Sequence, residues 1–453
     1  MNQGINRRGF LGATAQTAAA AAALFHIVPR HVLGGTAHAA PSEKLNIAGI
    51  GVGGMGASNL RNLRSENIVA LCDVDTAYAA KTFEHYPDAA VYTDYRVLLE
   101  KEKDLDAVLI ATPDHTHAVI AAAAMRAGKH VYCQKPLTHK VRESRILAQI
   151  AAETGVCTQM GIQGHSGRDA RQVCEWIAAG AIGRVREVIT WCSLSYYPWG
   201  HAYWSSPFGT RPEETPPAPD TLDWDLWLGP APHRPYHPTY HPLTWRSWWD
   251  FGCGMMGDRG AHTLDPVVWA LNLGAPETVE ANSTDLNPET HPIATIVRYQ
   301  FPARGDMPPV TLSWYDGLEP PRHQDVANPR DLGDGEGGAL FVGEDGLLTC
   351  GTYGNSPRLL PKSRMDAFTP PPETIERVPD SHEMDWVRGC KNGTPAGADF
   401  SYSGPLTETA LLGNIAKRFP RTILHWDAAT MTFKDNPDAT AHVNPPYREG
   451  WTL

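Results

Sequence analysis

Short apolar runs alternate with helical patterns in the first third of the chain. Continuous apolar runs are typical of buried parallel strands, and apolar residues at every third or fourth position are typical of amphipathic helices. Strands are expected at residues 45–50, 68–72, 105–111, 129–133 and 156–160, and helices at 57–63, 117–127 and 139–154. This order predicts a doubly wound α/β domain over residues 44–165.

The pattern changes after residue 165. A helix at 168–179 and a strand at 184–196 precede a proline-rich stretch, roughly 198–249, which has no clean period and holds seven of the 14 tryptophans. Further strands are expected at 277–281, 293–301, 310–314, 339–342 and 347–350, and a late helix at 406–419. These elements predict an α+β domain over 166–425 with a large, mostly antiparallel open sheet, followed by a polar tail at 426–453.

The first forty residues have the composition of an export signal. Arg7 and Arg8 precede a weakly apolar stretch at 13–28, and Ala37-His38-Ala39 supplies small residues at a cleavage position. A charged, then apolar, then small-residue order is typical of signals that are removed from the mature protein. The paired arginines favour the twin-arginine route, so we expect residues 1–40 to direct the protein to the periplasm or beyond.

Composition excludes several classes of partner. The chain has 453 residues and a net charge of −11, and it contains no basic block, which argues against nucleic acid and anionic membrane surfaces. No apolar run reaches the ~20 residues that a membrane-spanning helix needs. The eight cysteines include no C-x-x-C pair, and the 19 histidines form no evident ligand cluster, so no metal site is expected.

A glycine-rich loop joins the first expected strand to the first expected helix. The loop reads Gly51-Val52-Gly53-Gly54-Met55-Gly56, and Asp73 ends the second strand 22 residues after Gly51. Glycines there allow the backbone to approach a pyrophosphate at a helix N-terminus, and a carboxylate at that spacing can accept a ribose hydroxyl. Asp73 would also repel a 2′-phosphate. The loop therefore predicts a dinucleotide site that favours NAD over NADP.

Three further motifs resemble those of the Gfo/Idh/MocA oxidoreductases. They are Thr112-Pro113-Asp114-His115-Thr116-His117, then Gly128-Lys129-His130-Val131-Tyr132-Cys133-Gln134-Lys135-Pro136, then Gly257-Asp258-Arg259-Gly260-Ala261-His262-Thr263-Leu264-Asp265. The resemblance covers nearly all of the chain after the signal. It implies an N-terminal Rossmann domain joined to an α/β domain with a large open sheet, and possible homo-oligomers formed through that sheet.

The same resemblance implies roles for individual residues. Lys135 resembles the family's catalytic lysine, and His262 resembles its acid/base residue. Asp258, four residues before His262, would lie on the same helix face and orient the imidazole. Asp265 could share this orienting role. The expected cofactor-binding residues are Gly51, Gly53, Gly54, Met55, Gly56, Asp73, Thr112, Pro113, His117, Gln134, Lys135 and Gln163. Family members usually have glutamate before the lysine. Gln134 lacks that negative charge, so Lys135 should accept a proton more readily.

The tryptophan-rich stretch has two interpretations, which the sequence leaves open. Aromatic faces stack on sugar rings, with Asp223, Asp225, His237 and Arg246 as candidate hydroxyl partners, but tryptophans also fill the space under long loops. Residues expected to contact substrate are His165, Trp199, Trp204, Trp248, Trp249 and Asp265.

The leading hypothesis is an exported NAD-dependent oxidoreductase that acts on a carbohydrate or polyol. Free NAD is scarce outside the cytoplasm, so the cofactor should be held through the catalytic cycle. An alternative is a redox-neutral, NAD-dependent glycosidase that oxidises a sugar hydroxyl transiently, as in α-N-acetylgalactosaminidases that resemble this family. A third hypothesis is a non-catalytic sugar-binding protein.

Overall fold

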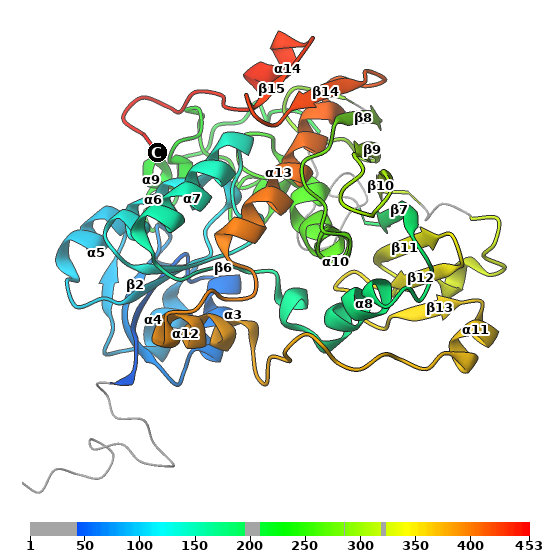
Figure 1. Ribbon diagram of the computed structural model, residues 1–453. Helices are drawn as coiled ribbons and strands as arrows, with labels where there is room; N and C mark the ends of the chain where they lie inside the picture. The colour runs from blue at the N-terminus through cyan, green and yellow to red at the C-terminus, as the bar shows by residue number, and fades with distance from the viewer. Residues whose placement is uncertain (1–42, 195–208, 285, 319–322) are drawn as a thin grey trace, which may run out of the picture. The chain divides into compact units, whose positions relative to one another are not determined.

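The computed structural model describes residues 43–194, 209–284, 286–318 and 323–453. All of the helices and strands described below lie in one unit, Asn46–Leu453 (Figure 1). The expected export signal and two of the expected substrate contacts, Trp199 and Trp204, lie outside the described residues.

Six parallel strands form the first sheet of the described residues, in the order β3-β2-β1-β4-β5-β6. They are β1 (Asn46–Ile50), β2 (Asn67–Cys72), β3 (Ala90–Tyr92), β4 (Ala107–Ile110), β5 (His130–Cys133) and β6 (Thr158–Met160). The connecting helices are α3 (Met55–Asn62), α4 (Ala80–His85), α5 (Tyr95–Lys101), α6 (Asp114–Arg126) and α7 (Val141–Thr154). Because β1 pairs with both β2 and β4, the strand order reverses at β1, where such sheets bind ligands. This sheet confirms the predicted Rossmann fold.

The second sheet has nine strands among the described residues, in the order β13-β12-β11-β7-β10-β9-β8-β14-β15. Every pair is antiparallel except β7 with β10. The strands are β7 (Val185–Cys192), β8 (Thr278–Ser283), β9 (Thr295–Phe301), β10 (Val310–Asp316), β11 (Gly337–Gly343), β12 (Leu347–Cys350), β13 (Arg358–Leu360), β14 (Leu424–Asp427) and β15 (Thr432–Phe433). The mostly antiparallel sheet that the sequence predicts is confirmed.

Helices and single turns complete the second half of the chain. The helices are α8 (Arg168–Ala178), α9 (Trp224–Leu228), α10 (Ala261–Leu271), α11 (Lys362–Ala367), α12 (His382–Asn392), α13 (Phe400–Lys417) and α14 (Pro437–Ala441). The turns are η2 (Gln163–Ser166), η3 (Thr244–Ser247), the π turn η4 (Met256–Gly260) and η5 (Pro329–Asp331).

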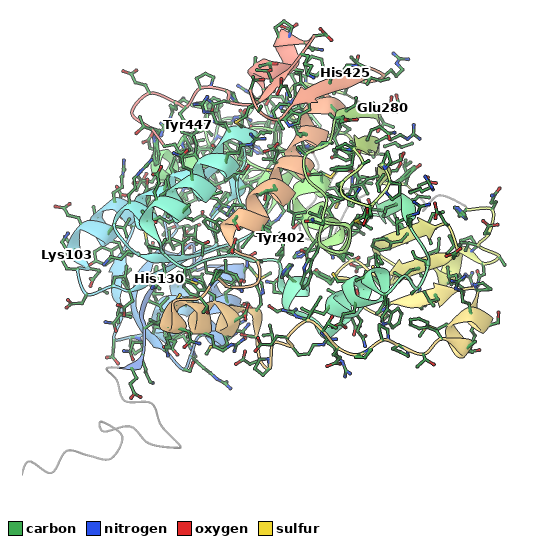
Figure 2. The ribbon with its side chains drawn as sticks, viewed as in Figure 1. Lys103, His130, Glu280, Tyr402, His425 and Tyr447 are labelled. Carbon is green, nitrogen blue, oxygen red and sulfur yellow. The ribbon has the colours of Figure 1, made fainter. Side chains whose placement is uncertain are left out.

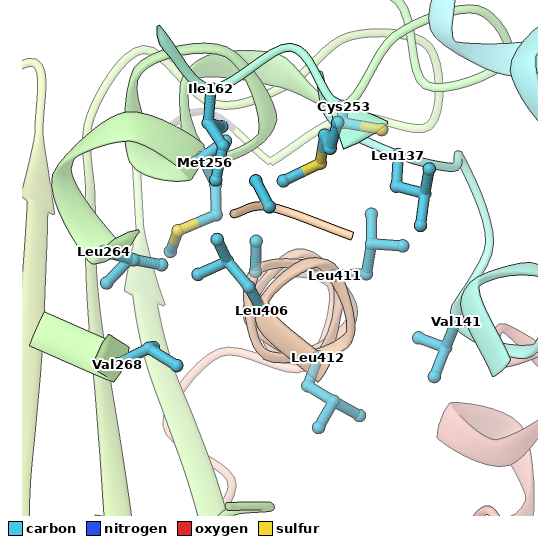
Figure 3. Packing of buried hydrophobic residues seen from close by; sticks show 14 of the residues in the cluster. Leu137, Val141, Ile162, Cys253, Met256, Leu264, Val268, Leu406, Leu411 and Leu412 are labelled. Atoms are coloured by element: carbon cyan, nitrogen blue, oxygen red, sulfur yellow. The ribbon is translucent and has the colours of Figure 1, made fainter. Parts of the chain in front are cut away.

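Helix α13 joins the two halves of this unit. It contacts α7 and β6 on one side, and α10, β8 and β9 on the other (Figure 1, orange). Its leucines are buried in a hydrophobic cluster to which both sheets contribute. Figure 3 shows this cluster around α13, with side chains from both sides: Leu137, Val141, Met256, Leu264, Val268, Leu406, Leu411 and Leu412.

The segment after residue 425 is more ordered than the expected polar tail. It supplies β15 and α14, and its last residues return to the first half of the chain. Tyr447 donates its hydroxyl hydrogen to Glu143 of α7 over 2.6 Å, and its ring lies under the Lys140 ammonium (Figure 2). Arg448 is paired with Asp225. The C-terminal segment is therefore bound to the body of the protein near its ligand cavities.

The core contains a buried ion pair that should be costly to break. Nζ of Lys417, at the end of α13, lies 3.1 Å from Oδ2 of Asp316 in β10, and both side chains are buried. We expect Lys417→Met to lower the free energy of unfolding by about 3–5 kcal/mol, because it leaves a buried carboxylate without its cation. Urea denaturation measures the change. The control is Lys362→Met, which removes an exposed pair with Asp366 and should cost less than about 1 kcal/mol. Equal small effects would contradict this account of the core.

Candidate active site

A cavity of about 340 Å³ opens at the carboxyl ends of the central strands of the first sheet. Its wall includes the glycine-rich loop after β1, the end of β2, the segment after β4 and the Gln134–Pro136 segment after β5. Predicted site residues among its lining are Gly51, Gly53, Gly54, Met55, Asp73, Thr112, Pro113, Gln134, Lys135 and Asp258. The structure therefore brings most of the expected cofactor residues to one cavity.

The glycine-rich loop has the close packing that a dinucleotide cradle requires. Gly51 has a φ of 79°, and a Cβ atom there would lie 2.7 Å from the backbone of Thr112. A Cβ on Gly56 would lie 2.1 Å from the carbonyl oxygen of Gly51. Side chains at these positions would move the loop away from α3, whose N-terminus it presents to the cavity. The loop and the cavity together fit a bound dinucleotide.

Asp73 anchors this loop as well as facing the cavity. Its Oδ2 accepts the backbone N–H of Val52 at 2.8 Å and that of Gly53 at 3.2 Å, and its Oδ1 accepts the N–H of Asp75 at 3.0 Å. Burial raises the pKa of Asp73 to about 6, although these hydrogen bonds oppose the shift. The carboxyl is therefore ionised above about pH 6, as repulsion of a 2′-phosphate requires.

Lys135 and Asp258 meet at one end of the cavity. The Lys135 ammonium contacts the Asp258 carboxylate directly and lies 3.2 Å from the Asp258 carbonyl oxygen. Both side chains are nearly buried. Burial and the nearby guanidinium groups of Arg246 and Arg259 lower the pKa of Lys135 to about 7. A lysine with this pKa can gain or lose a proton at neutral pH.

The D-x-x-x-H motif does not form the expected aspartate–histidine pair. Asp258 lies in the π turn η4, which precedes α10 and changes the helical phase, and its carboxylate turns to Lys135. His262 is buried, and its Nδ1 has no hydrogen-bond partner within the described residues. Burial and the charge of Lys135 lower the pKa of His262 well below its usual range. His262 is thus a neutral imidazole, and it is absent from the cavity lining.

Other predicted residues hold the walls of the cavity in place. His117 is buried, and its two ring nitrogens lie 2.8 Å from the carbonyl oxygens of Thr112 and Pro136, which ties together the segments after β4 and β5. Gln134 donates from Nε2 to Oδ1 of Asn59 in α3 at 3.0 Å. Gln163 lies in η2 and is absent from the cavity lining. Its expected contact with the cofactor stays a prediction.

His165 and Asp265, which were expected to contact substrate, form a buried network instead. The His165 Nδ1 lies 2.8 Å from Asp265 Oδ1, which also accepts the Tyr402 hydroxyl at 2.7 Å. The His165 ring stacks on Trp269 with centroids 3.9 Å apart. Neither residue lines the cavity, because these partners occupy their polar atoms inside the fold.

The described part of the tryptophan-rich stretch covers the cavity. Its main chain bonds to the segment after β2, with Thr76 donating to Thr221 and Asp223 donating to Val74, each over 2.9 Å. The cover contributes Leu226, Trp227, His241, Pro242, Leu243, Trp245 and Arg246 to the lining. Most of the described tryptophans of this stretch pack into the cover, and Trp227 and Trp245 also line the cavity.

Two tryptophans expected to stack on substrate lie elsewhere. Trp248 is fully buried, with its Nε1 donating to the Thr239 carbonyl at 3.2 Å, so it presents no face to a ligand. Trp249 lines a second cavity. Three of the residues proposed to bind sugar hydroxyls have partners within the protein. Asp223 caps α9, and Asp225 pairs with Arg448. His237 accepts a backbone N–H. Arg246 does line the main cavity.

Several lining residues could not be identified from the sequence. Tyr78 lies against the glycine loop, since a Cβ on Gly53 would meet its ring at 2.1 Å. Trp451, the third-last residue of the chain, also lines the cavity. Both belong to segments without a periodic pattern. No group of three or more possible metal ligands is found in the described part of the chain. The helices there include none that is long and apolar enough to cross a membrane.

Comparison with known proteins agrees with this geometry. Residues 45–162 match the model of an oxidoreductase family with an NAD-binding Rossmann fold, and residues 167–303 match that of its C-terminal alpha/beta domain. An inositol 2-dehydrogenase from Rubrobacter xylanophilus is 31% identical over 147 residues, which are 31% of this chain and 42% of that protein. Glycosyl hydrolase family 109 protein 1 from Shewanella sp. (strain ANA-3) is 32% identical over 155 residues, 32% of this chain and 34% of that protein. The matches span less than half the length of these curated relatives.

Solved structures share the fold over most of the chain. The WlbA dehydrogenase from Bordetella pertussis, crystallised with NADH and UDP-GlcNAcA, has a TM-score of 0.56 at 17% identity, over 85% of this chain and 99% of that one. The myo-inositol 2-dehydrogenase from Lactobacillus plantarum has a TM-score of 0.53 at 15% identity, over 84% and 99%. At these identities the likeness shows a common fold.

Asp73 should control both affinity for the dinucleotide and the choice between dinucleotides. We expect Asp73→Ala to weaken NAD binding by about tenfold or more, because it removes an anchor of the loop and an acceptor for a ribose hydroxyl. It should also reduce the ratio of NAD affinity to NADP affinity, because it removes the charge that repels a 2′-phosphate. Isothermal titration at pH 8, where the carboxyl is ionised, measures both affinities. Asp88→Ala, an exposed change, is the control. Equal affinities of the parent protein for NAD and NADP would refute this role.

Proposed function

Because the chain belongs to the Gfo/Idh/MocA oxidoreductase family, we propose that it is an NAD-dependent oxidoreductase that acts on a hydroxyl group of a carbohydrate or polyol. The observation that carries the proposal is Lys135 in contact with Asp258 at the end of the cavity that the glycine loop lines. Named relatives that act on inositol support the class of substrate.

The residues at the cavity end suit the removal of a hydroxyl proton. Bound NAD supplies a hydride acceptor, and Gly51–Gly56, Asp73 and Thr112 are the residues that would hold it. Neutral Lys135 accepts the hydroxyl proton, and the Asp258 carboxylate stabilises the ammonium that results. His262 lies outside the lining of this cavity, so its proposed acid/base role rests on the family motif and not on a contact with the cavity. Burial around these groups excludes water from the proton transfer.

Replacement of the two proposed proton-handling residues tests this assignment. Lys135→Ala and His262→Ala should each lower turnover by about two to four orders of magnitude while folding and NAD binding are retained. Retained turnover in both variants would eliminate the proposed site.

The pH dependence provides an independent readout. Lys135 is neutral above its pKa of about 7, so the rate of hydroxyl oxidation should rise with pH and level off above that value. The reverse reduction needs the ammonium and should fall over the same range. A rate of oxidation that declines as pH rises through 7 would contradict Lys135 as the base.

The cover over the cavity supports a cofactor that is held through the cycle. Leu226, Trp227 and Trp245 on one side and Trp451 on the other flank the space that a dinucleotide would fill, so its release would require these segments to move. A held cofactor must be returned to its starting state by a second half-reaction. That step is either reduction of another carbonyl compound or, in the second candidate function, completion of glycoside hydrolysis. Relatives named glycosyl hydrolase family 109 protein and alpha-N-acetylgalactosaminidase favour the latter.

An experiment without added NAD separates these outcomes. The mature protein is incubated with candidate glycosides and polyols in deuterated water. Repeated turnover with bond cleavage and deuterium beside the oxidised carbon is expected for the glycosidase. Repeated turnover that depends on an added carbonyl acceptor, without cleavage, is expected for the oxidoreductase. Turnover that depends strictly on added NAD and releases one NADH for each product would refute the proposal that the cofactor is held through the cycle.

We also propose that the protein is exported by the twin-arginine route, on the basis of Arg7, Arg8 and the residues that follow them. This route carries folded proteins, which would allow NAD to be acquired before export. Replacing both arginines with lysine should leave the protein in the cytoplasm, because recognition requires the guanidinium groups. Cell fractionation with an antibody measures the distribution, and normal export of the double variant would overturn the assignment.

A further inference from the structure

A second cavity, of about 280 Å³, lies behind the Lys135 segment. Its walls come from the start of α7, the segment before η4 and helix α13, with prolines of the C-terminal segment also lining it. Cys253 lines this cavity, and its backbone N–H donates to Asp114, which lines the first cavity, over 2.9 Å. A thin wall therefore separates the two cavities, and the chemistry proposed for the first uses no residue of the second.

The second cavity contains hydrogen-bond acceptors without donors. Asn414 of α13 donates from Nδ2 to the Cys253 carbonyl at 2.8 Å, and its buried Oδ1 has no partner within the described residues. His139 Nε2 lies 3.0 Å from the Trp249 carbonyl, so this nitrogen carries the hydrogen and Nδ1 is left as an acceptor. Burial lowers the pKa of His139 to about 3, which keeps the ring neutral. Buried acceptors of this kind are usually satisfied by a donor.

The cavity also contains a cation that no carboxylate pairs with in the described part of the chain. The Arg418 guanidinium lies 3.9 Å from the centroid of the Trp249 ring. The one acidic residue in the lining, Asp250, is paired with Arg234. A second cation is the ammonium of Lys140. Its Nζ lies 4.0 Å from Oε1 of Glu143 and donates a hydrogen bond to the Pro445 carbonyl oxygen. The lining therefore combines an available guanidinium with neutral acceptors.

We propose that this second cavity binds a small carboxylate that also carries hydroxyl groups, such as a sugar acid. A guanidinium offers a carboxylate two parallel hydrogen bonds, and hydroxyl groups supply the donors that Asn414 and His139 lack. The volume is close to the lower end of the range for small-molecule sites, which suits a ligand with the size of one monosaccharide. This site is independent of the reaction proposed for the first cavity.

Calorimetric titration of the full chain with D-gluconate tests the proposal. We expect saturable binding of one gluconate per chain. Arg418→Gln should weaken this binding at least about tenfold, because a charged hydrogen-bond donor is lost, and Arg418→Lys should weaken it less. Polyols also belong to the substrate class proposed for the first cavity, so binding to the second cavity is taken as the part of each isotherm that Arg418→Gln removes. In that part, sorbitol, a polyol of the same chain length without the carboxylate, should bind at least about tenfold more weakly than gluconate. Lys135→Ala, in the first cavity, should leave gluconate affinity unchanged.

Circular dichroism and an unchanged affinity for NAD show that each variant is folded. If Arg418→Gln does not fold, Arg418→Lys still tests the contribution of the guanidinium. Absence of saturable gluconate binding, equal affinity for sorbitol, or an affinity that falls in Lys135→Ala but not in either Arg418 variant would overturn the proposal.

Discussion

The contact between Lys135 and Asp258 is the interaction on which the rest of the site depends. Lys135 follows a strand of the first sheet, and Asp258 belongs to the turn that begins α10 in the second half of the chain. Removing two charges from water costs several kcal/mol for each charge, so they must be held close and in a fixed geometry. Gly257 permits this approach, because a Cβ there would lie 3.2 Å from Pro136 and 2.2 Å from Cys253. Packing of the two halves around α13 thus places a lysine of lowered pKa against its carboxylate partner.

Enclosure and charge act together in this arrangement. The cover formed by residues 221–246 and Trp451 reduces the access of water to the cavity, and the same burial lowers the pKa of Lys135 and His262. Both groups are thereby brought toward the neutral forms that accept protons. A cover in this position would also slow the release of a dinucleotide. Proton chemistry and retention of the cofactor follow from one structural feature.

Features that rest on local sequence could be predicted. The glycine loop, Asp73 and the segment ending in Lys135 each follow a strand directly, and the fold of parallel strands alone brings their ends together. Most strands and helices of the first domain were predicted. The exceptions are β3, α4 and α5, which are short and partly exposed and carry too weak a pattern.

Features that depend on contacts distant in sequence could not be predicted. Regular helical spacing paired Asp258 with His262, but a π turn directs Asp258 to Lys135, 123 residues earlier. His165 and Asp265 have suitable chemistry for substrate binding, yet Tyr402 and Trp269 enclose them. Trp248 and Trp451 show the same limit, because residue type alone does not tell which aromatic ring is buried and which faces the cavity.

The most direct test of the account is to measure the nucleotide that the protein carries. The protein is purified without added cofactor and denatured in acid or in alkali, which preserve NAD and NADH respectively, and the released nucleotide is quantified by chromatography. The account predicts close to one NAD or NADH per chain in the parent and a clear reduction in Asp73→Ala. Recovery of NADP in place of NAD, or of no dinucleotide from correctly folded protein, would contradict it.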